Sequence, residues 1–110
     1  MTIFEKIINK QIPAQIVYED ERALAFKDIN PVAPVHCLII PKKRITNIAS
    51  MEDADLELMG HLMFVCQKVA QIMKVQDYRI VSNNGEGAGQ SVFHLHFHLI
   101  AGRELKWPPG

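Results

Sequence analysis

Residues 94–98 read His-Leu-His-Phe-His, and this strict alternation constrains the fold more than any other segment. Successive side chains of a β-strand point to opposite faces of a sheet, so the three imidazoles share one face. The positions between and beside them are apolar and form the opposite face, as a hydrophobic core requires: Phe93, Leu95, Phe97 and Leu99. We therefore predict a long final strand over residues 92–101 with a row of histidines on one side.

Four further strands are predicted by short apolar runs that end at turn residues. Residues 15–19 and 22–27 predict a hairpin, because the turn-like pair Asp20-Glu21 separates them. Residues 36–40 form an almost continuous apolar run, which is typical of a central strand. Residues 78–82 predict the fourth of these strands.

Two helices are predicted. Thr2 and Glu5 have capping-box spacing, so a short helix is expected to begin there, to end before Pro13 and to pack as a lid on the sheet. Ser50 with Asp53 predicts the cap of a long helix that runs to about residue 74. The element order favours an α+β fold in one domain over residues 1–110, with a five-stranded, mostly antiparallel sheet and its helices on one face.

The long helix carries apolar residues around most of its circumference, well beyond one stripe. A helix of this kind in a small domain is expected to have a second partner. We therefore expect a homodimer formed through the long helix and an edge strand. Coverage by the sheet and the N-terminal helix alone is the alternative.

Charge and composition exclude several classes of protein. With 12 basic and 12 acidic side chains, the chain lacks the electrostatic drive of a nucleic-acid binder, and the basic cluster at 42–44 is interpreted as a surface turn. No segment approaches the roughly 20 apolar residues of a membrane span. No secretory signal is readable, so a cytoplasmic location is expected. Cys37 and Cys66 show no Cys-x-x-Cys spacing and are interpreted as buried apolar residues.

The histidine row indicates nucleophilic chemistry. At neutral pH an imidazole is mostly uncharged, and one ring nitrogen is free to attack phosphorus and form a phosphohistidine adduct. Like charges depress one another's pKa, so we expect a neutral nucleophile and a cationic acid in the same row. Two alternatives stay open: a zinc site built on a His-x-His pair, and a half-exposed strand whose polar residues happen to be histidine.

The loop over residues 83–91 leads directly into this row and contains three glycines. Glycines let backbone N–H groups approach an anion closely. Glycine-rich loops are more often plain turns, and this one matches neither of the common glycine motifs for phosphate. Its position nevertheless predicts that it places phosphate oxygens beside the imidazoles.

The pattern His-x-His-x-His followed by two apolar residues resembles the motif of the histidine triad superfamily and is highly specific. Segments across nearly the whole chain are similar to the Hint branch: 26–29, 34–43, 89–92 and 107–110. The resemblance implies a homodimeric α+β fold and a purine nucleoside phosphoramidase. Such an enzyme hydrolyses adenosine 5′-phosphoramidate or AMP-lysine through a nucleotidyl-histidine intermediate, without a metal or other cofactor.

The same resemblance implies roles for individual residues. His96 would be the nucleophile, with His94, His98 and His36 orienting it and hydrogen-bonding the phosphate. Ser91 would contact the leaving nitrogen. The implied nucleotide-binding residues are Asp28 at the ribose, Ile29 and Phe26 at the base, Asn83 and Gly89 at the phosphate or ribose, and also Gln90, Ser91, Val92, His96 and His98. The apolar tail at 107–109 would dock on the neighbouring subunit, whereas His61 matches no motif and is interpreted as a surface or interface residue.

Two other functions remain as alternatives. The first is a dinucleoside polyphosphate hydrolase or nucleotidyl transferase from another branch of the superfamily, although the tail at 107–110 favours the Hint branch. The second is a zinc- or nucleotide-binding adaptor that acts through protein interactions.

Overall fold

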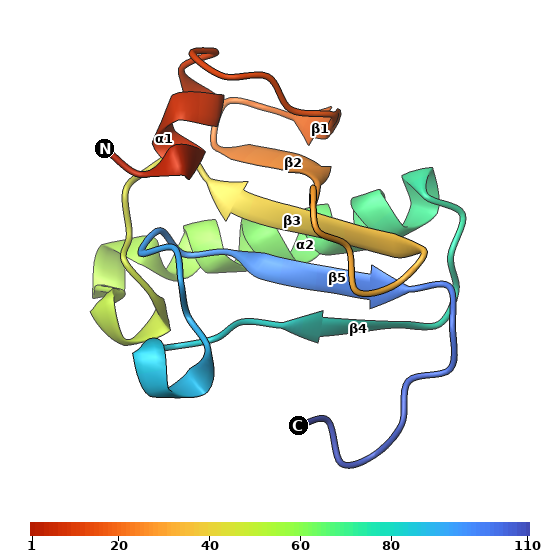
Figure 1. Cartoon of the computed structure of the whole chain (residues 1–110). Coiled ribbons are helices and arrows are strands. Elements are labelled where there is room, and N and C mark those ends of the chain that lie inside the picture. Colours follow the sequence, from red (N-terminus) through yellow and green to blue (C-terminus); the bar gives the residue numbers. More distant parts are fainter.

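The computed structural model describes residues 1–110 as a five-stranded sheet with a helix on each side (Figure 1). The strand order is β1-β2-β3-β5-β4, and every neighbouring pair is antiparallel. The helices and strands are α1 (Ile3–Ile8), β1 (Ile16–Glu19), β2 (Ala23–Lys27), β3 (Val35–Pro41), α2 (Leu56–Ile72), β4 (Tyr78–Val81) and β5 (Phe97–Ala101). The α+β fold, the hairpin and the central strand are therefore confirmed.

The two helices cover opposite faces of the sheet, so the prediction that both lie on one face is wrong. Along β2, Ala23 and Ala25 pack in the cluster that contains α2, whereas Leu24 and Phe26 pack in the cluster that contains α1. Strands β2 and β3 are thus buried on both sides, which explains their continuous apolar runs. The short helix α1 does act as a lid, and it lies over the face that carries the histidines.

The final strand is shorter than predicted, because the residues from 92 to 96 leave the sheet. The β3–β5 register pairs Ile39 with Phe97, and two residues further along it would set Pro41 opposite Leu95. Proline has no N–H to donate, so the ladder stops there. The expected alternation survives the strand end except at Phe93, which is 38% exposed instead of buried.

A capping box lies at the start of α1, and another closes the 3-10 turn Asp53–Asp55 just before α2. At α1 the predicted box is present: the Thr2 hydroxyl accepts the Glu5 N–H, and the Glu5 carboxylate accepts the Thr2 N–H. The predicted Ser50 cap of α2 is wrong, because the Ser50 hydroxyl bonds Asn47 in a separate 3-10 turn. A second box formed by Glu52 and Asp55 leads into α2 instead.

The remaining sequence features take ordinary structural places. Cys37 and Cys66 are buried as predicted, and burial raises the pKa of Cys66 to about 12. The cations at 42–44 are each paired with an acidic side chain, as expected of a surface turn: Lys42 with Glu19, Lys43 with Asp55 and Arg44 with Glu5. None of the helices is long and apolar enough to cross a lipid bilayer.

Candidate active site

A cavity of about 460 Å³ lies between α1, the segment after β2, and the ends of β3 and β5. It brings together eight of the residues singled out from the sequence: Phe26, Asp28, Ile29, His36, Ser91, Val92, His96 and His98. A larger hollow of about 810 Å³ lies at the other end of β5, against the C-terminal segment, and no histidine lines it. We therefore place the candidate active site in the smaller cavity.

Four of the predicted site residues do not line this cavity: His94, Asn83, Gly89 and Gln90. His94 is fully buried behind α1, where its Nε2–H donates to the Pro41 carbonyl at 2.8 Å and its Nδ1 atom has no partner. In the glycine-rich loop, Gly85 and Gly89 adopt positive φ angles of 93° and 98°, which favour glycine. Asn83 lies beside Gly89, at the end of that loop nearest β4.

The Gln90 side chain is a structural hub of the loop. It is buried, and its amide oxygen accepts the Asn47 Nδ2–H and the Gly85 backbone N–H. Its amide nitrogen donates to the carbonyls of Thr46 and Val92. All four hydrogen-bonding positions of this side chain are therefore occupied within the protein.

His96 is held as one tautomer. Its Nδ1 atom lies 2.7 Å from the backbone carbonyl of His94, and because a carbonyl can only accept, Nδ1 carries the hydrogen. The Nε2 atom then keeps its lone pair, and no protein group bonds it. Burial lowers the pKa of His96, so this tautomer is uncharged at neutral pH.

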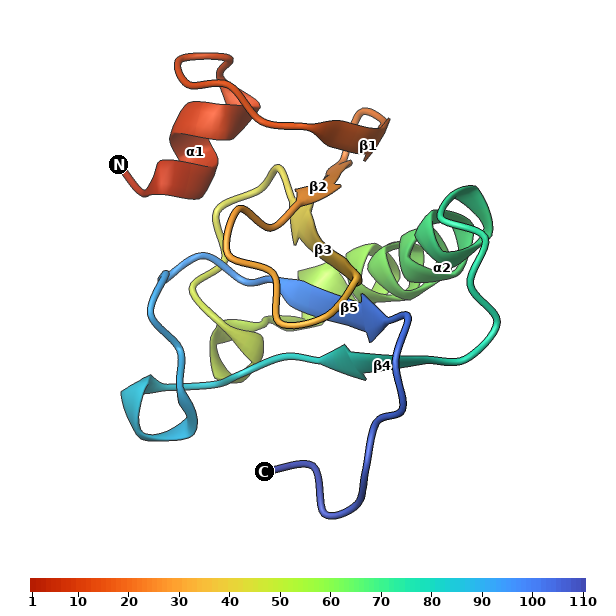
Figure 2. The same ribbon diagram turned by 45° about the vertical axis from the view of Figure 1, so that its right-hand side comes forward.

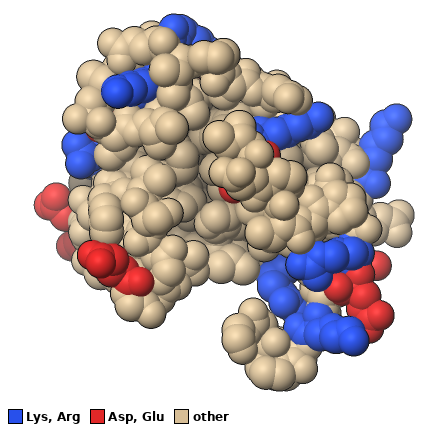
Figure 3. Space-filling model, viewed as in Figure 1, with Lys and Arg blue, Asp and Glu red and all other residues tan.

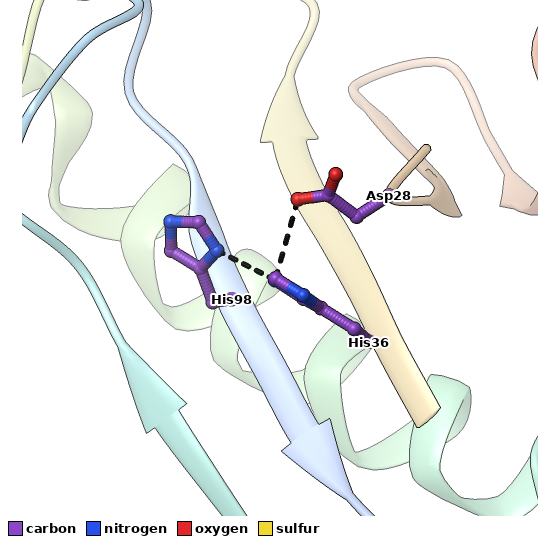
Figure 4. Close-up of side chains that lie close together, drawn as sticks. All are labelled: Asp28, His36 and His98. Carbon is purple, nitrogen blue, oxygen red and sulfur yellow. Dashed lines mark hydrogen bonds and ion pairs between the residues drawn. The ribbon is translucent and has the colours of Figure 1, made fainter. Parts of the chain in front are cut away.

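Two further imidazoles, His36 on β3 and His98 on β5, lie side by side across the two strands (Figure 4). The Nδ1 atom of His36 accepts the backbone N–H of Val32 at 3.1 Å, so the hydrogen of this ring is on Nε2. That Nε2–H lies 2.9 Å from Nδ1 of His98 and 3.4 Å from the Asp28 carboxylate. The Nδ1 atom of His98 accepts, which leaves its Nε2–H as a donor within the cavity.

The expectation of a cationic acid in the row finds no support in these environments. Burial lowers the pKa of His94 and of His96. Burial, together with the neighbouring rings of His96 and His36, lowers the pKa of His98 to about 4. All three members of the row are therefore neutral at physiological pH.

The family model of the HIT domain matches residues 9–105 of this chain. The chain belongs to the HIT domain family. It is 51% identical over 112 residues to a 14 kDa zinc-binding protein of Zea mays, covering 99% of this chain and 88% of that protein.

Solved structures agree with this assignment. A HIT family hydrolase from Legionella pneumophila superposes with a TM-score of 0.96 at 46% identity, covering 100% of both chains. A histidine triad protein from Clostridium difficile gives a TM-score of 0.90 at 42% identity, covering 94% of this chain and 92% of that one. The candidate site therefore sits in the fold of the HIT domain.

Three side chains of this HIT domain could hold a metal ion. One ligand atom each from Asp28, His36 and His98 lies within 4.8 Å of the others. Two imidazole nitrogens and a carboxylate suit zinc. A metal would have to replace the hydrogen on His36 Nε2, so metal binding and the His36–His98 hydrogen bond exclude each other.

Sequence reasoning missed the role of His61. Its Nε2 atom lies 2.7 Å from the Asp20 carboxylate, so it joins α2 to the β1–β2 turn, a role that the interpretation as a surface or interface residue did not include. The Tyr18 hydroxyl donates to the same carboxylate oxygen at 2.7 Å. Asp20 was identified only as a turn residue, and nothing in the local sequence of α2 points to this pairing.

Proposed function

We propose that this HIT domain hydrolyses the phosphorus–nitrogen bond of purine nucleoside 5′-phosphoramidates through a nucleotidyl-histidine intermediate. The observation that carries the proposal is the His96 tautomer, because Nδ1–H is bound to the His94 carbonyl and Nε2 remains an uncharged nucleophile in the cavity. In the first step Nε2 attacks the α-phosphorus, the phosphorus–nitrogen bond breaks, and the leaving nitrogen takes a proton from solvent through the Ser91 hydroxyl and departs as the amine. In the second step water attacks phosphorus, gives a proton back to solvent, breaks the bond to Nε2, releases the nucleoside monophosphate and restores His96.

The surrounding groups suit the phosphate and the leaving amine. The Nε2–H of His98 would donate to a phosphate oxygen, since His36 holds that ring by its other nitrogen. The Ser91 hydroxyl would contact the leaving nitrogen from the same cavity wall. His94 would act from behind, through its backbone carbonyl and not through its ring. Donors already aimed at the reacting group lower the barrier without reorganisation.

The nucleoside half of the cavity is largely apolar. Phe26 and Ile29 would border the base, and the Asp28 carboxylate would accept the ribose hydroxyls beside them. On the face that is viewed in Figure 3, charged side chains lie mainly around the edge and the central hollow is mostly uncharged. We therefore expect binding of a purine nucleotide with little salt dependence and no affinity for long nucleic acids.

Intact-protein mass spectrometry tests the covalent step directly. The His98→Ala variant is expected to hydrolyse the adduct slowly, so mixing it with adenosine 5′-phosphoramidate should add the mass of one nucleotidyl group, lost when His96 is also replaced by Ala. Faster turnover of a diadenosine polyphosphate than of the phosphoramidate would favour the alternative hydrolase. An unmodified mass during steady turnover would contradict the proposal.

Metal binding is a second candidate function, favoured by the cluster of Asp28, His36 and His98. The Zea mays relative is named as a zinc-binding protein. Bound zinc would supply a Lewis acid beside the phosphate. Activity that survives EDTA and is abolished by His96→Ala supports the metal-free route. Activity that is lost with EDTA and restored by zinc would reverse that assignment.

We also propose that the chain acts as a homodimer in the cytoplasm. Apolar side chains on α2 and β4 stay exposed in the single chain, among them Phe64, Ile72 and Tyr78. The segment after β5 extends away from the sheet (Figure 2), and Trp107 is 82% exposed there. A second copy of the chain would cover the exposed apolar side chains and the tail, and the tail of one subunit would then lie near the site of the other. A monomer mass by light scattering at micromolar concentration would contradict the dimer.

A further inference from the structure

Ser82, the residue after β4, contacts the backbone of the proposed nucleophile. Its hydroxyl donates to the backbone carbonyl of His96, with Oγ 2.9 Å from the carbonyl oxygen. Ser82 does not line the cavity, so it is not placed to touch a substrate. We propose that Ser82 is a positioning residue for the His96 nucleophile, an inference that rests on the proposed function.

The position of His96 at the end of the sheet explains why its carbonyl needs this donor. The β4–β5 ladder ends at the pair Val81–His98, and the β3–β5 ladder ends at Ile39–Phe97. His96 lies beyond both ends, and no backbone N–H donates to its carbonyl. The serine hydroxyl therefore replaces a ladder bond where the sheet stops supporting the chain.

This bond completes a clamp on both parts of the nucleophile. The ring of His96 is fixed by its Nδ1–H to the His94 carbonyl, and the peptide of His96 is fixed by Ser82. Because the His94 carbonyl is only two residues away, rotation of the His96 peptide would change the distance between ring and carbonyl. Ser82, directly after β4, therefore holds the tautomer that leaves Nε2 free.

The matched pair Ser82→Thr and Ser82→Val tests this role, because threonine keeps the hydroxyl and valine has the same shape without it. We expect Ser82→Val to lower kcat for adenosine 5′-phosphoramidate about tenfold with KM unchanged, because a displaced nucleophile slows chemistry but not binding. Ser82→Thr should stay within about twofold of the native kcat. Equal kcat values for the two variants would overturn the inference.

A second measurement separates this inference from the proposed function. Nitrogen-15 NMR of the imidazoles should show His96 with hydrogen on Nδ1 in the native protein and in Ser82→Thr, and a mixture of tautomers in Ser82→Val. This readout needs no turnover, so a changed spectrum in a protein that cleaves no phosphoramidate would reject the function and retain the clamp. An unchanged His96 spectrum in Ser82→Val would reject the clamp even in an active enzyme. Ser82→Ala serves in the same two measurements if the valine variant does not fold.

Discussion

The Nε2 atom of His36 lies 2.9 Å from the Nδ1 atom of His98, across the β3–β5 pair. The direction of this bond is set outside the pair, because the backbone N–H of Val32 occupies Nδ1 of His36 at 3.1 Å. A backbone amide thus determines the tautomers of two rings in succession. The result is an Nε2–H of His98 that can donate to a phosphate oxygen without any change of charge.

We expect His36→Phe to lower kcat/KM for a nucleoside phosphoramidate at least about tenfold, which corresponds to the loss of one hydrogen bond in a buried site. Phenylalanine keeps an aromatic ring but cannot donate to Nδ1 of His98, so that ring can reverse its tautomer. Steady-state kinetics gives the effect. His61→Phe is the matched control, because His61 lies on α2 and contacts Asp20 instead of the cavity. Equal losses in the two variants would show that the His36 effect is a general loss of folding.

The pH dependence of activity follows from the lowered histidine pKa values. Burial lowers the pKa of His96 and brings that of His98 to about 4, so both stay neutral as the pH falls through about 6.5, the ordinary value for histidine. We expect the acid limb of the kcat/KM profile, where the nucleophile gains a proton, to be centred below 6.5. An acid limb centred at or above 6.5 would contradict this, provided that circular dichroism shows the protein folded throughout.

Gln90 is expected to act on stability and not by touching the nucleotide. Replacing it with Ala leaves two carbonyls and two N–H donors without partners, so the free energy of unfolding should fall by about 2–3 kcal/mol without any ligand present. Urea denaturation measures the change. Gln71→Ala, at an exposed position on α2, should stay within about 0.5 kcal/mol of the native protein. A normal unfolding free energy with weakened nucleotide binding would restore Gln90 as a direct contact.

The sequence could predict which side chains of the final strand share a face, because the alternation of His94, His96 and His98 depends only on an extended backbone. It could not predict how deeply they lie. Phe4 of α1 packs edge-on against the rings of His94 and His96, with ring centroids 6.0 Å and 4.9 Å away, and this cover comes from a segment 90 residues earlier. Burial lowers the pKa of all three histidines, so the cationic acid that was predicted from the row is absent at neutral pH.

Other parts of the site lay outside local sequence patterns for a similar reason. In the sequence, Ser82 is an ordinary polar residue at the end of a strand. Its hydrogen-bond partner, the His96 carbonyl, follows only from the register of β4 against β5. Gln90 lies in a loop, where the sequence pattern is the same whether a side chain contacts a ligand or points into the protein. The inward orientation of Gln90 could therefore not be predicted. The family resemblance named eight of the residues that line the cavity, and the tertiary contacts set the tautomers of its histidines.

Asp20 makes the stability of the fold pH-dependent. Burial by itself would raise the pKa of this carboxyl, but hydrogen bonds from Tyr18, from two backbone N–H groups and from His61 outweigh it and lower the pKa to about 2. The unfolded value is about 3.9, so the carboxylate contributes stability above about pH 4 and loses it as the pH falls toward 2.

Asp20→Asn should therefore lower the free energy of unfolding by roughly 2 kcal/mol at pH 7, and the difference from the native protein should shrink between about pH 4 and pH 2. Urea titrations at a series of pH values measure it. Asp77→Asn, at an exposed aspartate without a side-chain hydrogen bond, is the control and should show little change at any pH. A constant difference across this range would mean that the carboxylate charge is not what Asp20 contributes.

The C-terminus of α2 offers a stabilising substitution. Lys74 has φ of 58°, and the bonds from Lys74 N–H to the Gln71 carbonyl and from Val75 N–H to the Ala70 carbonyl form the helix-ending motif that favours glycine. Lys74→Gly removes a strain of about 1–2 kcal/mol and adds chain entropy to the unfolded state, so the net gain should be about 0.5–1 kcal/mol, or roughly 4 °C in Tm. Gln67→Gly, in the exposed middle of the same helix, should instead cost about 1 kcal/mol. Thermal denaturation of the two variants tests the strain. If Lys74 is strained, Lys74→Gly raises Tm while Gln67→Gly lowers it, whereas a general cost of glycine would lower Tm in both variants.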